Sequence, residues 1–169
     1  LPLYTRTDAE RSLTRFATVP FEKEAHLVGS TLRLRRAGHI LGAATAEVRA
    51  DDTTIVFSGD LGRPHDPILD PPKPIAEADY LVVESTYGDR THSDVDALTA
   101  LAAVISRSAA RGGVIVIPAF AVGRAQTLLY ALHRLKEQRQ IPDIPVFLNS
   151  PMAADATRIY ADHGVEHRL

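Results

Sequence analysis

Hydrophobic and polar residues alternate along the first third of the chain in the way that half-buried strands require. Leu32 and Leu34 alternate with Thr and Arg between residues 26 and 36, and this two-residue period predicts one strand. The segments TAEVRA (45–50) and TTIVFS (53–58) repeat the pattern on either side of two aspartates, which predicts an antiparallel hairpin. The first part of the chain is therefore expected to form an antiparallel sheet.

The segments on either side of these strands carry helix and loop signals. The first 17 residues predict a short helix, because Thr7 is a suitable N-cap for a turn that carries Asp8 and Glu10. The segment 59–74, GDLGRPHDPILDPPKP, is dense in Gly and Pro and predicts a loop.

The pattern changes near residue 80, where short apolar runs begin to alternate with helical periodicity. YLVVE (80–84), VIVIP (114–118) and IPVFLN (144–149) are typical of buried strands. An alternation of strands with helices favours parallel pairing through right-handed crossovers. The change in composition between residues 85 and 93 predicts a domain boundary, with one domain over 1–88 and a second over 89–169.

Three helices are expected among these later strands. Ser93 precedes Asp96 by three residues, which is the spacing of a capping box. Gly123 opens the next helix, and residues 152–162 predict a third. The apolar positions that recur at helical spacing are Leu98, Leu101, Ala102 and Ile105 in the first helix, and Ala125, Leu128, Leu129, Leu132 and Leu135 in the second.

Composition narrows the class of protein and the chemistry open to it. The 169 residues are 45% hydrophobic and 24% charged, as in soluble globular proteins that form one domain or parts of two. The chain has no cysteine, so disulfides and thiolate metal sites are excluded, and a metal would take nitrogen and oxygen ligands. No secretory leader or membrane-spanning run is visible in the sequence. A cytoplasmic location is therefore the default expectation, and no membrane partner is expected. The first residue is leucine, which suggests a piece of a longer chain.

The balance of charge argues against nucleic-acid binding through bulk charge alone. The formal net charge is −2, although residues 94–140 hold six Lys and Arg against three Asp and Glu. A modest basic run of this kind is usually the solvated face of a helix.

Two ionisable side chains lie at strand ends between glycines. His39 lies between Gly38 and Gly42, and Asp60 lies within the turn Gly-Asp-Leu-Gly that directly follows the 53–58 strand. Glycines let neighbouring groups approach closely, and an imidazole with a carboxylate suits a zinc-type ion. The alternative is that each residue only stabilises its own turn, and for either residue taken alone this is the more common outcome.

Glu84 and Arg124 are two further candidates. Glu84 ends an apolar strand, where a carboxylate needs a hydrogen-bond or ion-pair partner, and a purely structural pair would also satisfy it. Arg124 and Gln126 lie in the first turn of a helix that follows a strand end, where exposed amides and an arginine make a phosphate site. A solvated helix arginine is the common alternative.

Five ordered motifs resemble one family over nearly the whole chain. AGHILGAA (37–44), FSGDLGRP (57–64), ESTYGDRTH (84–92), IPAFAVGRAQTLLY (117–130) and LNSPMA (148–153) resemble the β-CASP branch of the metallo-β-lactamase-fold hydrolases. That branch contains RNA 3′-end processing endonucleases and their bacterial and archaeal relatives. The resemblance implies an α/β fold, with part of a metallo-β-lactamase αββα sandwich followed by the start of a parallel-sheet β-CASP insert.

The same resemblance implies roles for individual residues. His39 corresponds to a ligand of one zinc, and Asp60 to the carboxylate that bridges two zincs. Glu84 corresponds to the acidic first motif of the insert, which orients a histidine that assists protonation of the leaving group. The implied reaction is cleavage of an RNA phosphodiester by metal-activated water, with Asp60 and Glu84 as catalytic residues and Ser85, Thr86 and Arg124 as substrate-binding residues.

The departures from the family pattern matter equally. The His-x-His-x-Asp-His ligand cluster of the family is absent, and the later β-CASP histidines lie beyond the end of this chain. The chain is therefore expected to be an internal fragment with an incomplete zinc site, which needs the remaining parts of a longer chain as partners. A hydrolase of small substrates and a non-catalytic scaffold stay open as alternatives, as does a homodimer.

Overall fold

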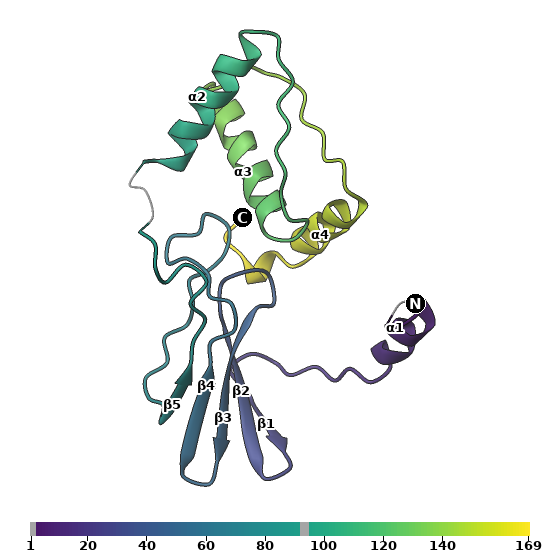
Figure 1. Cartoon of the computed structure of the whole chain (residues 1–169), viewed down its shortest axis with the longest axis vertical. Helices are drawn as coiled ribbons and strands as arrows, with labels where there is room; N and C mark the ends of the chain where they lie inside the picture. The colour runs from purple at the N-terminus through teal and green to yellow at the C-terminus, as the bar shows by residue number, and fades with distance from the viewer. Residues whose placement is uncertain (1–2, 92–94) are drawn as a thin grey trace.

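A computed structural model describes residues 3–91 and 95–169 and shows one five-stranded sheet, with the helices of the second half of the chain beyond one end of it and the N-terminal helix off to one side (Figure 1). The strands lie in sequence order, and β1–β4 pair antiparallel while β5 pairs parallel to β4. The protein is therefore mixed α/β. The strands are β1 (Glu24–Leu27), β2 (Ser30–Arg36), β3 (Ala44–Ala50), β4 (Thr53–Phe57) and β5 (Tyr80–Val82).

The expected hairpin of residues 45–50 and 53–58 is confirmed as β3 and β4. The single strand expected over residues 26–36 is wrong, because the chain reverses at Val28 and Gly29 to form β1 and β2. Gly29 has a φ of +72°, which glycine adopts without a steric penalty. A two-residue period continues across such a reversal, so alternation alone did not reveal the turn.

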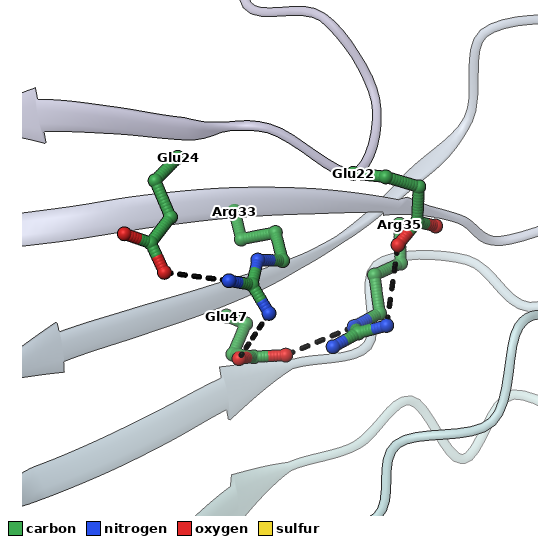
Figure 2. Close-up of polar contacts among 5 residues, drawn as sticks. All are labelled: Glu22, Glu24, Arg33, Arg35 and Glu47. Atoms are coloured by element: carbon green, nitrogen blue, oxygen red, sulfur yellow. Dashed lines mark hydrogen bonds and ion pairs between the residues drawn. The ribbon is translucent and has the colours of Figure 1, made fainter.

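One face of the sheet carries a ladder of charged side chains across β1–β3 (Figure 2). Arg33 lies 2.5 Å from Glu24 and 3.9 Å from Glu47, and Arg35 lies 2.9 Å from Glu47 and 3.2 Å from Glu22. Cross-strand pairs of opposite charge stabilise a sheet modestly and fix its register. Val56 and Thr45 lie on the same face and are buried, so the charged ladder occupies only part of this face.

The opposite face of the sheet is apolar. The strand register places on it one aliphatic or aromatic residue after another: Leu32, Leu34, Val48, Ile55, Phe57, Tyr80 and Val82. In Figure 1 the later helices lie beyond the end of the sheet and the N-terminal helix lies off to one side, and none covers this face. The strand expected over 80–84 is confirmed as β5, but its expected burial is wrong, since Tyr80, Leu81, Val82 and Val83 are all more than half exposed.

Two helices begin at residues that differ from those predicted, whereas Gly123 is the N-cap of its helix, as expected. Thr5, not Thr7, caps α1 (Arg6–Leu13) through a reciprocal capping box with Asp8. Asp96 caps α2 (Ala97–Ala109) by accepting from the amide of Thr99, whereas the predicted cap Ser93 lies outside the described residues. The remaining helices are α3 (Arg124–Glu137), α4 (Pro151–Asp162) and the short 3₁₀ turn η1 (Gly164–Glu166).

The parallel sheet expected after residue 89 does not form within the described residues. Segments 114–118 and 144–149 are extended but have no assigned strand pairing. Only Ile115 and Ile144 pack against the core of Ile105, Leu135 and Ile141 that α2 and α3 build. Val116 and Phe147 are about 85% exposed. The apolar residues that predicted buried strands in these two segments are therefore partly left exposed. The boundary between 88 and 89 stays a prediction.

The end of the chain returns to the sheet. Glu166 pairs with Arg36 of β2 at 2.5 Å, and Arg168 pairs with Asp70 at 3.0 Å. Tyr160 of α4 is buried against Ile68 and Leu69. We call this contact between the C-terminal residues 160–168 and the loops at 36–43 and 66–70 the seam. In the described part of the chain, no helix is both long and apolar enough to cross a membrane.

Candidate metal and substrate site

His39 and Asp60 come together at one edge of the sheet. β2 and β4 both run antiparallel to β3, so the loops that follow them, carrying His39 and Asp60, leave the sheet at the same edge. The Nε2 atom of His39 lies 3.9 Å from Oδ2 of Asp60, and both side chains are substantially exposed. Two atoms that share an ion at about 2.0–2.2 Å can be at most about 4.4 Å apart. The predicted proximity of the two residues is confirmed.

Glycines allow the two loops to stack on each other. Gly62 follows Asp60, and its amide donates to the carbonyl oxygen of Ala37 at 2.8 Å. A Cβ atom at residue 62 would lie 1.8 Å from the carbonyl oxygen of Gly38. Gly38 has a φ of +67°, and a Cβ there would lie 2.5 Å from the carbonyl oxygen of Asp70. The flanking glycines are therefore required by backbone contact, and the position of one loop fixes the other.

Glu84 lies beside this pair because β5 is parallel to β4. Its Oε1 accepts from the amide of Leu61 at 3.0 Å, and its Oε2 accepts from the hydroxyl and amide of Thr86 at 2.7 and 3.2 Å. The Thr86 hydroxyl, then the amides of Leu61 and Thr86, and the nearby His39 all hold the pKa of Glu84 below its ordinary value. The partners that this carboxylate needs are thus supplied by its own turn, through Thr86, and by the loop of Asp60, through Leu61.

The fit to a metal is partial. His39 and Asp60 supply one nitrogen and one oxygen donor with the separation that a shared ion requires, and their exposure leaves room for further ligands. Among residues 3–91 and 95–169, no cluster of three or more His, Asp or Glu side chains is arranged to hold an ion. The described residues therefore account for part of a metal site, with no third ligand.

The two residues after Glu84 are exposed, as substrate-binding residues must be. The hydroxyl of Thr86 donates to Glu84, and the carbonyl oxygen of Ser85 accepts from the amide of Gly88 at 3.0 Å. Their expected role in substrate binding stays a prediction.

The first turn of α3 abuts the His39 loop. A Cβ at Gly123 would lie 2.8 Å from Cγ2 of Ile40, the residue that follows His39. Arg124 is the first helical residue and is exposed, and within the described chain it has no ion-pair partner. The guanidinium is therefore available near the candidate site.

The expectation of exposed amides at this helix start is wrong. The amide of Gly123 donates to Oε1 of Gln126 at 2.7 Å, that of Arg124 to the carbonyl oxygen of Val122 at 3.1 Å, and that of Ala125 to Phe120 at 3.2 Å. The amides are used by their own loop, so a phosphate contact here would come from the Arg124 side chain.

Two residues that position the site were not singled out as site residues by the sequence. Gln126 is buried and bonds to Gly123, the Ala121 carbonyl oxygen and Thr157, which fixes the loop before α3. Its place three residues after Gly123 is a capping-box spacing and could have revealed it. Tyr160 contacts the His39 loop from 119 residues away, and no local pattern signals that contact.

Comparisons with known proteins agree with these motifs. Residues 125–169 match the Beta-Casp domain family. Ribonuclease TTHA0252 of Thermus thermophilus is 31% identical over 160 residues, which cover 94% of this chain and 37% of that protein. Cleavage and polyadenylation specificity factor 73 of Drosophila melanogaster is 32% identical over 94% of this chain and 24% of its own length.

A third relative, transcription termination factor FttA of Methanosarcina mazei, is 35% identical over 78% of this chain and 22% of its own length. The chain thus spans between about a fifth and somewhat more than a third of the length of these curated relatives. The Beta-Casp match covers α3 and α4, while the longest alignments also take in the sheet with His39 and Asp60. On these grounds residues 125–169 match the Beta-Casp domain family, and the chain as a whole is similar to nucleases of the β-CASP branch of the metallo-β-lactamase-fold hydrolases.

Proposed function

We propose that this chain supplies part of the active site of a zinc-dependent nuclease that cleaves RNA phosphodiester bonds. The observation that carries the proposal is the convergence of His39 and Asp60 at 3.9 Å, with Glu84 hydrogen-bonded to the Asp60 loop. Metal dependence is a property of the family, and several relatives are named as ribonucleases or endoribonucleases. RNA is accordingly the proposed substrate.

Each residue has a defined task in this proposal. His39 and Asp60 bind zinc, which when bound lowers the pKa of water and offsets charge on phosphoryl oxygens. Glu84 holds the Asp60 loop through the Leu61 amide and lies close enough to His39 to interact with it electrostatically. Ser85, Thr86 and Arg124 lie on exposed turns around these groups, where a phosphate backbone would pass.

The test uses the full-length gene product that contains residues 1–169. The unaltered protein should cleave RNA, and a chelator should stop the cleavage. His39→Ala and Asp60→Ala should each abolish this cleavage, while His133→Ala should leave it intact. His133 is an exposed histidine of α3 that pairs with Glu137, and it makes the matched control. If the unaltered protein binds RNA without cleaving it, a non-catalytic scaffold is favoured. If it hydrolyses small phosphodiesters but not RNA, a hydrolase of small substrates is favoured.

Arg124 provides a test of substrate contact. A guanidinium that binds phosphate positions the backbone without reading bases, so Arg124→Ala should weaken binding of different RNA sequences about equally. The slope of log affinity against log salt should fall by roughly one, because about one phosphate contact is lost. Fluorescence anisotropy at several salt concentrations measures both quantities.

Arg134→Ala is the control for Arg124. Arg134 lies in the last turn of the same helix, where it stacks on Tyr130, so its loss should leave the salt slope unchanged. Equal affinities and equal slopes for Arg124→Ala and the unaltered protein would remove Arg124 from the site.

A further inference from the structure

We infer that Tyr160, on α4, is a positioning residue for the loop that carries His39. The inference rests on the proposed function, since it assigns to the β-CASP segment a part in placing a metal ligand. It concerns a side chain that neither contacts the candidate metal site nor belongs to a motif of the sequence.

The contact that carries the inference is a single hydrogen bond. The amide of Leu41, two residues after His39, donates to the hydroxyl oxygen of Tyr160 at 3.2 Å. Tyr160 is only 5% exposed, and Leu41 packs against the cluster that Tyr160 forms with Ile68 and Leu69. Burial raises the pKa of Tyr160, so the hydroxyl stays neutral at physiological pH.

The tyrosine is itself held rigidly in the seam. The Nε2 atom of His167 lies 2.7 Å from the carbonyl oxygen of Tyr160, and the two rings stack with centroids 6.1 Å apart. The ion pairs of Arg36 with Glu166 and of Asp70 with Arg168 tie the following residues to the sheet. A hydroxyl fixed in this way imposes its position on Leu41.

The loop that receives this bond has few other constraints on its outer side. It is anchored at its base, where the amide of Ala37 donates to Ala43 and Gly62 donates to Ala37. Its outer part turns through Gly42, which has a φ of +82° and open space around the position of a Cβ. The outer part also holds a bond from the amide of Ala43 to the carbonyl oxygen of Ile40 at 3.0 Å and lies against Gly123 at Ile40, and the Tyr160 hydroxyl adds the bond that fixes Leu41.

The chain offers a matched control for a test of this role. Tyr130 packs on the same cluster as Tyr160, but its hydroxyl has no hydrogen bond among the described residues. Tyr160→Phe and Tyr130→Phe therefore remove one hydroxyl that bonds to the His39 loop and one that has no hydrogen bond among the described residues.

The experiment compares the two variants in the full-length gene product by hydrogen exchange and zinc competition. Tyr160→Phe should speed exchange of the Leu41 amide by roughly fivefold, as expected for loss of one hydrogen bond, and weaken zinc binding several-fold. Tyr130→Phe should change neither. The melting temperatures of both variants should stay similar, which separates positioning from a general loss of stability.

The outcomes separate this inference from the proposed function. Unchanged Leu41 exchange in Tyr160→Phe, or faster exchange with unaltered zinc affinity, would overturn the positioning role. An unaltered protein that binds no zinc would instead contradict the proposed function, and the Leu41 exchange would still decide whether Tyr160 orders the loop.

Discussion

Glu84 shows how a carboxylate at the end of an apolar strand gains its partners. Its two oxygens accept three hydrogen bonds, from the Leu61 amide and from the amide and hydroxyl of Thr86. These bonds favour the ionised form, which is why its pKa is lowered. The stabilisation is present above the ordinary value of 4.5 and is lost as the pH falls through the lowered pKa of the folded state.

Replacing Thr86 by valine tests this account. Thr86→Val removes the hydroxyl that makes the largest contribution, so the pKa of Glu84 should rise toward its ordinary value. A pH titration of the Glu84 carboxyl carbon by NMR measures the change. Thr99→Val removes the equivalent hydroxyl from Asp96 and should leave Glu84 unaffected. A Glu84 titration that does not move in Thr86→Val would assign the shift to another group.

At the residue scale, the sequence predicted the pair at the core of the site together with Glu84 and Arg124, but not the residues that hold its loops through long-range contacts. His39 and Asp60 each follow a strand and stand among glycines, and those signals are local. Tyr160 and Gln126 act through contacts with residues far along the chain or buried by helix packing. No local pattern carries the long-range contact.

At the element scale, the sequence predicted where helices and strands occur better than it predicted which of them are buried or which strands pair. The hairpin of β3 and β4 formed as expected because its alternation and its turn lie within 15 residues. Segments 114–118 and 144–149 have the composition of strands but no ladder among the described residues. Strand pairing depends on a neighbouring strand, and composition does not say whether one is present.

The stacked loops of His39 and Asp60 give a sharp prediction at this scale. Gly62→Ala would place a methyl group 1.8 Å from the carbonyl oxygen of Gly38, so backbone must move. We expect the free energy of unfolding in urea to fall by about 3 kcal/mol or more, at the upper end of overpacking effects.

Gly164→Ala is the matched control for the loop glycine. No atom lies within 4 Å of a Cβ at residue 164, so the free energy of unfolding should change by about 0.5 kcal/mol or less. If Gly62→Ala and Gly164→Ala give similar midpoints and slopes in urea unfolding, the His39 and Asp60 loops can move apart without cost.

At the scale of the whole molecule, the two faces of the sheet differ in kind. The face in Figure 2 satisfies its charges within the sheet, while the opposite face presents aliphatic and aromatic side chains that no helix covers in Figure 1. The described residues likewise provide two candidate metal ligands and no third. Within the described residues, the apolar sheet face therefore has no covering helix and the candidate metal pair has no third ligand.

The chain on its own should accordingly lack nuclease activity. Catalytic zinc usually has three protein ligands, and the described residues bring only His39 and Asp60 together. We expect the purified 169-residue chain to cleave no labelled RNA in excess zinc beyond the rate seen with a chelator. Cleavage that a chelator abolishes and that His39→Ala removes would contradict this expectation.

The seam also sets an order of events during synthesis. The sheet pairs residues that are close in sequence, such as Arg36 with Ala44, so its hairpins can close while the chain is still being made. The bond from Leu41 to Tyr160 spans 119 residues, and the pair of Arg36 and Glu166 spans 130. The His39 loop therefore reaches its final shape only after the ribosome has passed the end of α4. Under the proposed function, His39 is therefore placed to bind a metal only after α4 has been made.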